Sequence, residues 1–371
     1  MIDAPPRSPA IASLVRSENA ILSIALAAMA ILPLAEMALR GTLGRGIPGA
    51  ASLVQHLTLI VGMMGAAIAA RDDRLLAIAG LHAFLKGRPA EAAHIVSNAI
   101  AAAVAAGLCY AAYTFVASEY QAGKQLIHGL PVWVIQAFLP LGFALIGIRL
   151  LWNASPRWSG RAIAVVVATL LLALVLYLPI ARETKVLAGL ITVVIAIVLG
   201  APVFTALGGA ALLLFWGAEL PTASLSLDHY RLVVNPSLPA IPLFTLAGYF
   251  LAESGAPRRL VRVFDALLGG LRGGAAAVTV FAGAFFTAFT GASGITILAL
   301  GGLLIPLLRG VGHSERAALG LVTSSGSLGV LLPPSLPLIL YAVVAKVPMR
   351  DMFLGAILPG LTMALLLLLW G

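Results

Sequence analysis

Residues 281–308 read FAGAFFTAFTGASGITILALGGLLIPLL, and residues 319–341, after a short basic turn, read LGLVTSSGSLGVLLPPSLPLILY. Both segments are apolar enough for a membrane interior, yet each is interrupted. The first breaks at Thr290–Gly294, and the second breaks at Ser324–Ser327 and at Pro333–Ser335. Gly and Pro weaken or end a helix and free backbone groups, which hydrocarbon tolerates only inside protein or beside a wet cavity. Two adjacent broken segments therefore predict an ion or substrate site near the middle of a membrane.

These interruptions predict two special elements. We expect residues 274–308 to form a re-entrant helical hairpin with its tip near Thr290–Gly294. We expect residues 315–345 to form a broken spanning helix whose unwound middle faces that tip. Unwound segments offer backbone carbonyls, and Ser or Thr adds uncharged hydroxyls, which together suit a sodium ion. Any one small residue more often serves close helix packing, so it is the clustering at two facing breaks that favours an ion site.

The composition excludes a soluble domain. Of the 371 residues, 61% are hydrophobic and 10% are charged, and the mean hydropathy is +1.06. A soluble fold could not bury so much apolar surface, so the chain is predicted to be an all-α polytopic membrane protein with about ten spanning helices. The net charge of +9 lies in short loops, and no aromatic platform or zinc pattern indicates nucleic-acid binding. Cys109 is the one cysteine of the sequence and lies in an apolar segment, so we expect it to serve in packing.

The apolar segments divide the chain into three parts. Residues 1–156 are predicted to form a four-helix membrane domain, with a charged Arg71–Arg74 segment ending the second span. Residues 157–184 are predicted to form a connecting transmembrane helix. Residues 185–371 are predicted to hold the hairpin, the broken helix and a last span.

A family resemblance rests on long, ordered motifs. FTGASG at 289–294, GHSERAALGLVTSSGSLGVLLPPSLPLILYAVVA at 312–345 and LPAIPLFTLAGYFLAESGAPRRLVRVFDALLGGLRGG at 238–274 resemble the large membrane subunit of tripartite ATP-independent periplasmic (TRAP) transporters. The four-span block with its charged connector resembles the small membrane subunit of the same family. The chain is therefore predicted to be a small subunit fused to the N-terminal half of a large one.

The resemblance implies a sodium-coupled secondary transporter of the bacterial inner membrane. It implies import of a small organic anion, of the carboxylate or acidic-sugar class, which a periplasmic substrate-binding protein delivers, and it implies an elevator mechanism. No cofactor is expected apart from sodium as the coupling ion. The sodium site carried over from the family comprises Thr290, Gly291, Ser293, Gly294, Ser324, Ser325, Gly326, Pro333 and Ser335. Only Thr296 is polar among the residues that directly follow the tip, so we expect backbone carbonyls to carry much of the binding.

Two other functions remain as alternatives. An intramembrane enzyme would need a nucleophile, a base or a metal cluster in the spans, and the sequence holds no HExxH motif, facing carboxylate pair or His/Cys cluster. A non-transporting scaffold fragment is the second alternative. ATP-driven transport is not expected, because the sequence has no GxxxxGK[ST] phosphate loop. We therefore expect no enzymatic activity, and the substrate itself is not readable from the sequence.

The distribution of positive charge predicts the orientation. With a cytoplasmic N-terminus, the inner loops hold 15 of the 23 Lys and Arg, which agrees with the positive-inside rule. An amphipathic, basic helix at residues 257–272 is expected along the cytoplasmic membrane face. The inner set comprises Arg7, Arg16, Arg71, Arg74, Lys86, Arg88, Arg149, Arg157, Arg161, Arg258, Arg259, Arg262, Arg272, Arg309 and Arg316.

The sequence contains one hairpin and one broken helix. Transporters of this architecture place their site between two inverted repeats, each with such a pair. We therefore expect the chain to need the remaining half of a large membrane subunit as a partner.

The predicted orientation can be tested by cysteine labelling in a variant that lacks Cys109. We expect Arg259→Cys to react with an impermeant thiol reagent only from the cytoplasm, and His128→Cys only from the periplasm, because of the charge asymmetry. Labelling of the Arg259→Cys variant from the periplasm would reverse the orientation.

Overall fold

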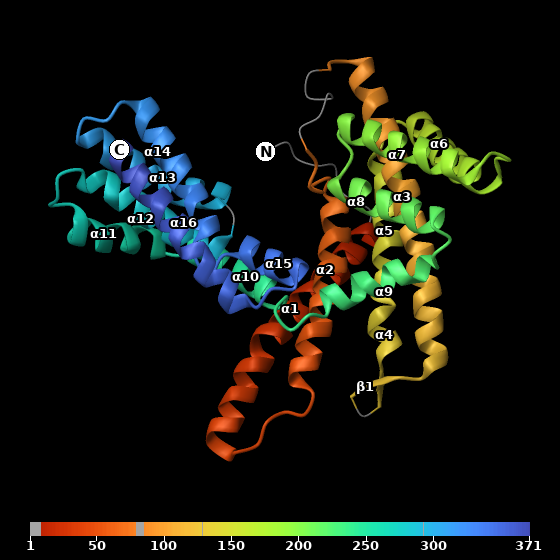
Figure 1. Cartoon of the computed structure of the whole chain (residues 1–371), viewed down its shortest axis with the longest axis horizontal. Coiled ribbons are helices and arrows are strands. Elements are labelled where there is room, and N and C mark those ends of the chain that lie inside the picture. Colours follow the sequence, from red (N-terminus) through yellow and green to blue (C-terminus); the bar gives the residue numbers. More distant parts are fainter. Residues whose placement is uncertain (1–8, 79–84, 128, 292) are drawn as a thin grey trace. The chain divides into compact units, whose positions relative to one another are not determined.

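The computed structural model describes residues 9–78, 85–127, 129–291 and 293–371 (Figure 1). Within these residues the regular elements are helices and one short antiparallel pair of strands, which loops and turns connect. The elements are α1 (Pro9–Leu43), α2 (Ala50–Arg71), α3 (Arg88–Ala122), β1 (Gln125–Ile127), β2 (Leu130–Pro131), α4 (Val132–Gln136), α5 (Phe138–Asn153), α6 (Trp158–Tyr177), α7 (Arg182–Val198), α8 (Val203–Gly217), α9 (Thr222–Val233), α10 (Ala240–Glu253), α11 (Ala256–Leu268), α12 (Gly274–Thr290), α13 (Ser293–Gly310), α14 (Glu315–Leu328), a 3₁₀ helix (Gly329–Leu331), α15 (Leu336–Ala345) and α16 (Met349–Trp370).

The predicted class, an all-α polytopic membrane protein, is confirmed. Within the described residues, eight segments are long and apolar enough to cross a membrane, where α4 with α5 and α14 with α15 each count as one segment. The sequence predicted about ten spans. Three of them, α7, α8 and α10, are helices of only 17, 15 and 14 residues, and one of the eight segments is α13, an arm of the predicted hairpin. The chain forms two compact units, Met1–Val234 and Asn235–Gly371.

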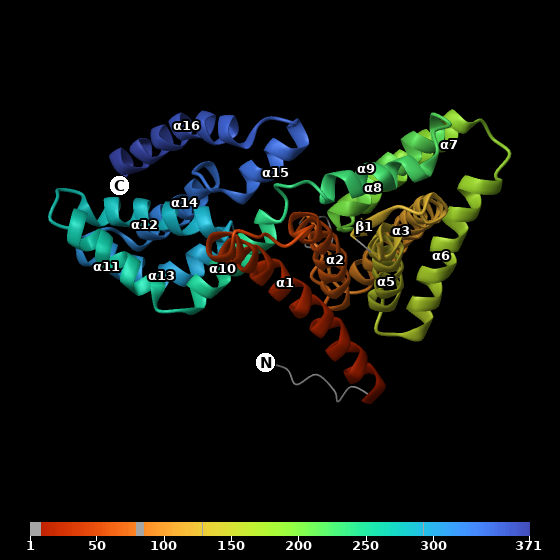
Figure 2. The same ribbon diagram turned by 90° about the horizontal axis from the view of Figure 1, so that it is seen from below.

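The first unit is built around α3, a helix of 35 residues that packs against α5, α6 and α9 (Figure 2). Small side chains such as Ala101 and Ala105 are fully buried and let neighbouring helices approach closely. Leu59 of α2 and Leu139 of α5 fill the same core. Helix packing through small residues therefore organises this unit.

A buried carboxylate joins three helices of the first unit. Glu18 of α1 is 4% exposed, and its two carboxylate oxygens accept hydrogen bonds from Arg71 of α2 and Arg149 of α5. The bond from Arg71 measures 3.0 Å. Loss of one partner in a buried ion pair leaves the other charge without compensation in a poorly solvated place. Glu18 therefore fixes how the N-terminal half of α1 meets α2 and α5.

Helices α7, α8 and α9 also belong to the first unit, because all three pack on α3. The turn before α8 lies beside the segment that follows α2, since the Val203 N–H donates to the Leu76 carbonyl over 2.8 Å. The α7–α8 turn is therefore on the same side of this unit as Arg71.

The second unit is centred on α12, which packs against α11, α13 and α14. Val278, Leu304 and Leu321, from three different helices, are fully buried in its core. Helix α11 is amphipathic, as the sequence predicts: Phe264 and Leu268 face this core, and Arg258, Arg259 and Arg262 are exposed.

The buried carboxylate gives a stability prediction. We expect Glu18→Gln to lower the free energy of unfolding by about 3 kcal/mol, because Arg71 and Arg149 lose the charge that compensates them. Thermal unfolding in detergent measures the effect.

The matched control is Glu36→Gln on the same helix. Glu36 pairs with Arg40, whose side chain is 70% exposed, so we expect a change of less than about 1 kcal/mol. Equal losses in the two variants would contradict a special role for Glu18.

Candidate functional site

The turn between α12 and α13 lies at Gly291, within the segment where the sequence predicts a hairpin tip. Gly291 has a φ of 64°. Its N–H donates to the Thr287 carbonyl over 2.8 Å and closes the C-terminus of α12. Glycine adopts this left-handed conformation without the strain that a Cβ brings, so it sets where the helix stops. Ala292 of the predicted tip lies outside the described residues.

Three threonine hydroxyls meet next to this turn. Thr287 Oγ1 donates to Thr296 Oγ1 over 2.7 Å, and Thr290 Oγ1 lies 3.0 Å from the same oxygen. All three residues are buried, with at most 3% of their surface exposed. The cluster gathers neutral oxygens inside an apolar hairpin, which is an environment that suits an alkali cation better than a multivalent one.

Thr287 was missed by the sequence analysis, and Thr296 was noted only as an isolated polar residue. The signal was present, because Thr287 and Thr290 are three residues apart and so lie on one face of α12. What the spacing did not reveal is that α13 folds back to place Thr296 against that face.

The sequence analysis predicted a break at Ser324–Ser327, and this prediction is wrong. The residues Ser324–Ser327 lie inside α14, which continues to Leu328. The hydroxyls of Ser325 and Ser327 donate to carbonyls of the preceding turn, at 2.9 Å and 3.2 Å, so these side chains are satisfied within the helix. A single glycine, Gly326, is too small a perturbation to end a helix that packs on α12, α13 and α16.

The break lies after Leu328, where the sequence places its second interruption. A 3₁₀ turn and the residues Leu332–Ser335 separate α14 from α15. Prolines at 333 and 334 carry no amide N–H, so this segment cannot continue the helical hydrogen bonds. Ser335 is 1% exposed, and its hydroxyl donates to the Val330 carbonyl across the break.

Glycines bring the hairpin and the broken helix into backbone contact. A Cβ added at Gly283 would lie 2.6 Å from Ser325 Oγ, and one added at Gly329 would lie 2.5 Å from Thr287 Cβ. A Cβ added at Gly291 would overlap the Leu336 side chain, at the start of α15. The break therefore lies directly against the threonine cluster and the hairpin turn.

The structure brings together only part of the predicted site. Thr290, Gly291 and Ser335 lie around the hairpin turn and the break, and the Ser293 carbonyl is 3.6 Å from a Cβ added at Gly326. Ser325 contacts α12 at Gly283, about two turns before Thr290. Gly294 and Ser324 are exposed, and Pro333 is half-buried in the break.

Outside this site, His56 of α2 has a hydrogen-bonding partner on each ring nitrogen. His56 Nδ1 lies 2.7 Å from the Ser52 carbonyl, and His56 Nε2 lies 2.7 Å from the Tyr230 hydroxyl. Burial lowers the pKa of the neighbouring His229 imidazole, which favours its neutral form. Among the described residues, no three His, Cys, Asp or Glu side chains gather as metal ligands.

Two family profiles match the chain in tandem. Residues 29–160 match the DctQ component of tripartite ATP-independent periplasmic transporters, and residues 190–370 match the DctM component. The first match lies mostly within the predicted small-subunit-like part, residues 1–156, and the second lies within the predicted large-subunit-like part, residues 185–371. The second contains the hairpin, the threonine cluster and the break.

The relatives include both fused and separate permeases. The isethionate TRAP transporter permease protein DctMQ of Oleidesulfovibrio alaskensis is 32% identical over 249 residues, which are 64% of this chain and 38% of that protein. The C4-dicarboxylate TRAP transporter large permease protein DctM of Vibrio cholerae is 33% identical over a region that makes up 48% of this chain and 40% of that protein. The ectoine/5-hydroxyectoine TRAP transporter large permease protein UehC of Ruegeria pomeroyi is 28% identical over a region that makes up 47% of this chain and 42% of that protein. The chain thus spans about two fifths of the length of these relatives.

The close contact at Gly329 gives a prediction that does not depend on the transported molecule. We expect Gly329→Ala to lower the free energy of unfolding by about 2 kcal/mol, because the new methyl group overlaps α12 at Thr287. Denaturation in detergent measures the loss.

The control is Gly302→Ala in α13, where a Cβ meets nothing within 4 Å. Alanine there should leave stability unchanged or raise it by up to about 1 kcal/mol through helix propensity. A tolerated Gly329→Ala would mean that the break does not pack on the hairpin in this way.

Proposed function

Because the chain belongs to the TRAP transporter family and joins a small-subunit-like to a large-subunit-like region, we propose that it is a membrane component of a sodium-coupled importer of a small organic anion. Two of the relatives are named for anions, C4-dicarboxylate and isethionate, which supports this substrate class. The fused relative and the separate large-subunit relatives are all named as permeases, so the chain is a transporter component and not an enzyme.

The observation that carries sodium coupling is the buried cluster of Thr287, Thr290 and Thr296 beside the broken helix. Sodium needs several oxygen ligands and no strong base. Hydroxyls of these threonines and of Ser335, with carbonyls of the hairpin turn and the break, supply such ligands at one place. The proposed site therefore keeps Thr290, Gly291, Ser293 and Ser335 from the sequence prediction and adds Thr287 and Thr296.

An elevator mechanism is the second part of the proposal. It requires a body that carries the site and a body that stays fixed in the membrane. The second compact unit holds the hairpin and the broken helix in one continuous core, which supports its movement as a whole. The first unit has its own core, which supports a fixed role.

The proposal includes partners outside this chain. A periplasmic substrate-binding protein would deliver the anion. The remaining half of the large membrane subunit would supply the second wall of the substrate site, because the DctM relatives extend well beyond the matched region.

Ion coupling is tested by uptake into proteoliposomes of the complete transporter. We expect uptake to require an inward sodium gradient. In the double variant Thr287→Val/Thr296→Val we expect the half-saturating sodium concentration to rise at least about tenfold, because valine keeps the shape and removes two oxygens.

The matched control is Thr323→Val in α14. Thr323 is exposed, and its hydroxyl donates to the Leu319 carbonyl of its own helix. Uptake by the Thr323→Val variant should therefore depend on sodium as uptake by the wild type does. Full uptake driven by a proton gradient, with no response to sodium, would refute the coupling.

A further inference from the structure

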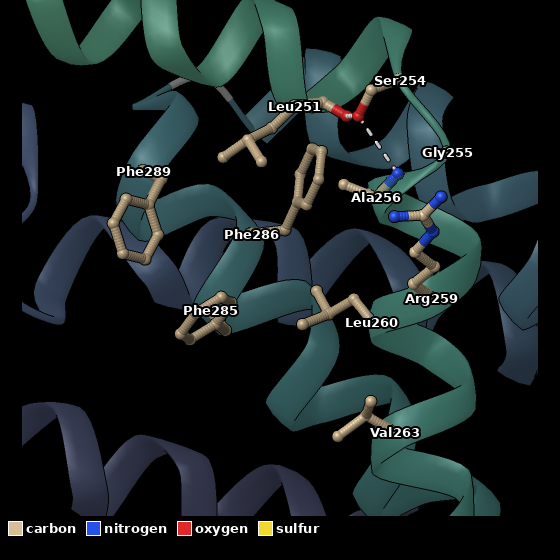
Figure 3. A pocket seen from close by; sticks show the side chains of 10 residues that line it. All are labelled: Leu251, Ser254, Gly255, Ala256, Arg259, Leu260, Val263, Phe285, Phe286 and Phe289. Atoms are coloured by element: carbon tan, nitrogen blue, oxygen red, sulfur yellow. Dashed lines mark hydrogen bonds between the residues drawn. The ribbon is translucent and has the colours of Figure 1, made fainter.

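A cavity of about 400 Å³ lies between α10, α11 and α12 in the second unit (Figure 3). Its walls are almost wholly apolar and include Leu251, Leu260, Phe285, Phe286 and Phe289. Figure 3 shows the aromatic rings of α12 on one side and the side chains of α11 on the other. A small, polar organic anion would lose its hydration here without gaining partners, so this cavity does not suit the transported substrate.

One end of the cavity carries positive charge. Arg259 lines it, and Figure 3 shows its guanidinium group beside Ser254 and Gly255. Arg258 and Arg262 are exposed on the same helix. Within the described part of the chain, none of these three arginines has a carboxylate within 4.0 Å. The cavity thus joins an apolar interior to a cationic edge at Arg259.

The cavity opens on an apolar surface. Val263 and Leu267 follow Arg259 at intervals of four residues along α11, and they are 54% and 69% exposed. Phe285, which forms part of the wall, is 48% exposed. Arg259 thus precedes a row of exposed apolar side chains on the same helix face. A cationic side chain beside an apolar surface is typical of helices that lie at the boundary between lipid headgroups and acyl chains.

We propose that this cavity binds an anionic phospholipid, with one acyl chain between α11 and α12 and the phosphate on Arg259. The apolar walls match the chain, and the cationic rim matches the phosphate. The volume lies within the usual range for small-molecule sites. The lipid would lie against Phe289, the residue before Thr290, and would brace α12 where the hairpin turns. The proposal stands whether or not sodium drives transport.

Native mass spectrometry of the complete transporter tests the charge requirement. The probes are phosphatidylglycerol and phosphatidylcholine with identical acyl chains at equal concentration. We expect phosphatidylglycerol to be retained preferentially, and Arg259→Gln to lower its retention about fivefold, because one arginine contact at a membrane surface is lost. Retention of phosphatidylcholine should not change.

The matched control for charge is Arg258→Gln, on the neighbouring residue that does not line the cavity. It should lower phosphatidylglycerol retention less than twofold. Equal loss in both variants would show only a diffuse basic surface and would overturn the site. If inorganic phosphate alone displaced phosphatidylglycerol, binding of the acyl chain between α11 and α12 would be overturned.

A tryptophan reporter tests the acyl chain directly. In Phe285→Trp, after subtraction of the signal from the five native tryptophans, phosphatidylglycerol with brominated chains should quench more than the phosphatidylcholine analogue. The matched control is Leu365→Trp, on an exposed position of α16, where the two lipids should quench equally. Equal quenching at position 285, or none because another part of the transporter covers the cavity, would overturn the proposal.

Discussion

The contact between α12 and α14 through glycine is the interaction on which the second unit depends. A helix that ends inside a membrane leaves carbonyl groups that water cannot reach, so another part of the protein must lie against them. Gly283 and Gly329 remove the side chains that would hold the two backbones apart. Because of this contact, the end of α14 and the turn of the hairpin share one buried space. The threonine cluster and Ser335 lie together for the same reason.

The first unit is organised by a different interaction. Glu18 is held between two arginines at one end of the helices, and small residues on α3 set the spacing between them. The same small-residue packing continues into α8, where a Cβ added at Gly208 would lie 2.8 Å from Leu108 and one at Gly209 would lie 3.0 Å from Val104. The compact unit therefore extends to Val234, although the DctM match begins at residue 190. The boundary between the compact units differs from the boundary between the two family matches, because α7, α8 and α9 pack on α3.

Two kinds of polar group serve different roles in this membrane protein. Hydroxyls and carbonyls are buried in the second unit, where they form the neutral ligand set of the proposed sodium site. Arginines of α11 remain at the surface of that unit, where they can contact lipid phosphates. Buried carboxylate charge in the described residues is paired, as at Glu18, and contributes to structure instead.

The sequence by itself determined the helical class, the turn at Gly291 and the break at Pro333 and Pro334. These features follow from local chemistry: long apolar segments must be helical in a membrane, glycine adopts a left-handed turn, and proline lacks an N–H. Only the tertiary structure decided that Ser324–Ser327 stay helical, because α14 packs on α12 and α13. The hydroxyls of Ser325 and Ser327 then bond to carbonyls within the helix. The tertiary structure also decided that Thr287, Thr290 and Thr296 form one cluster and that Glu18 joins Arg71 and Arg149. Such contacts link side chains on different helices, and no local pattern specifies which helices will meet.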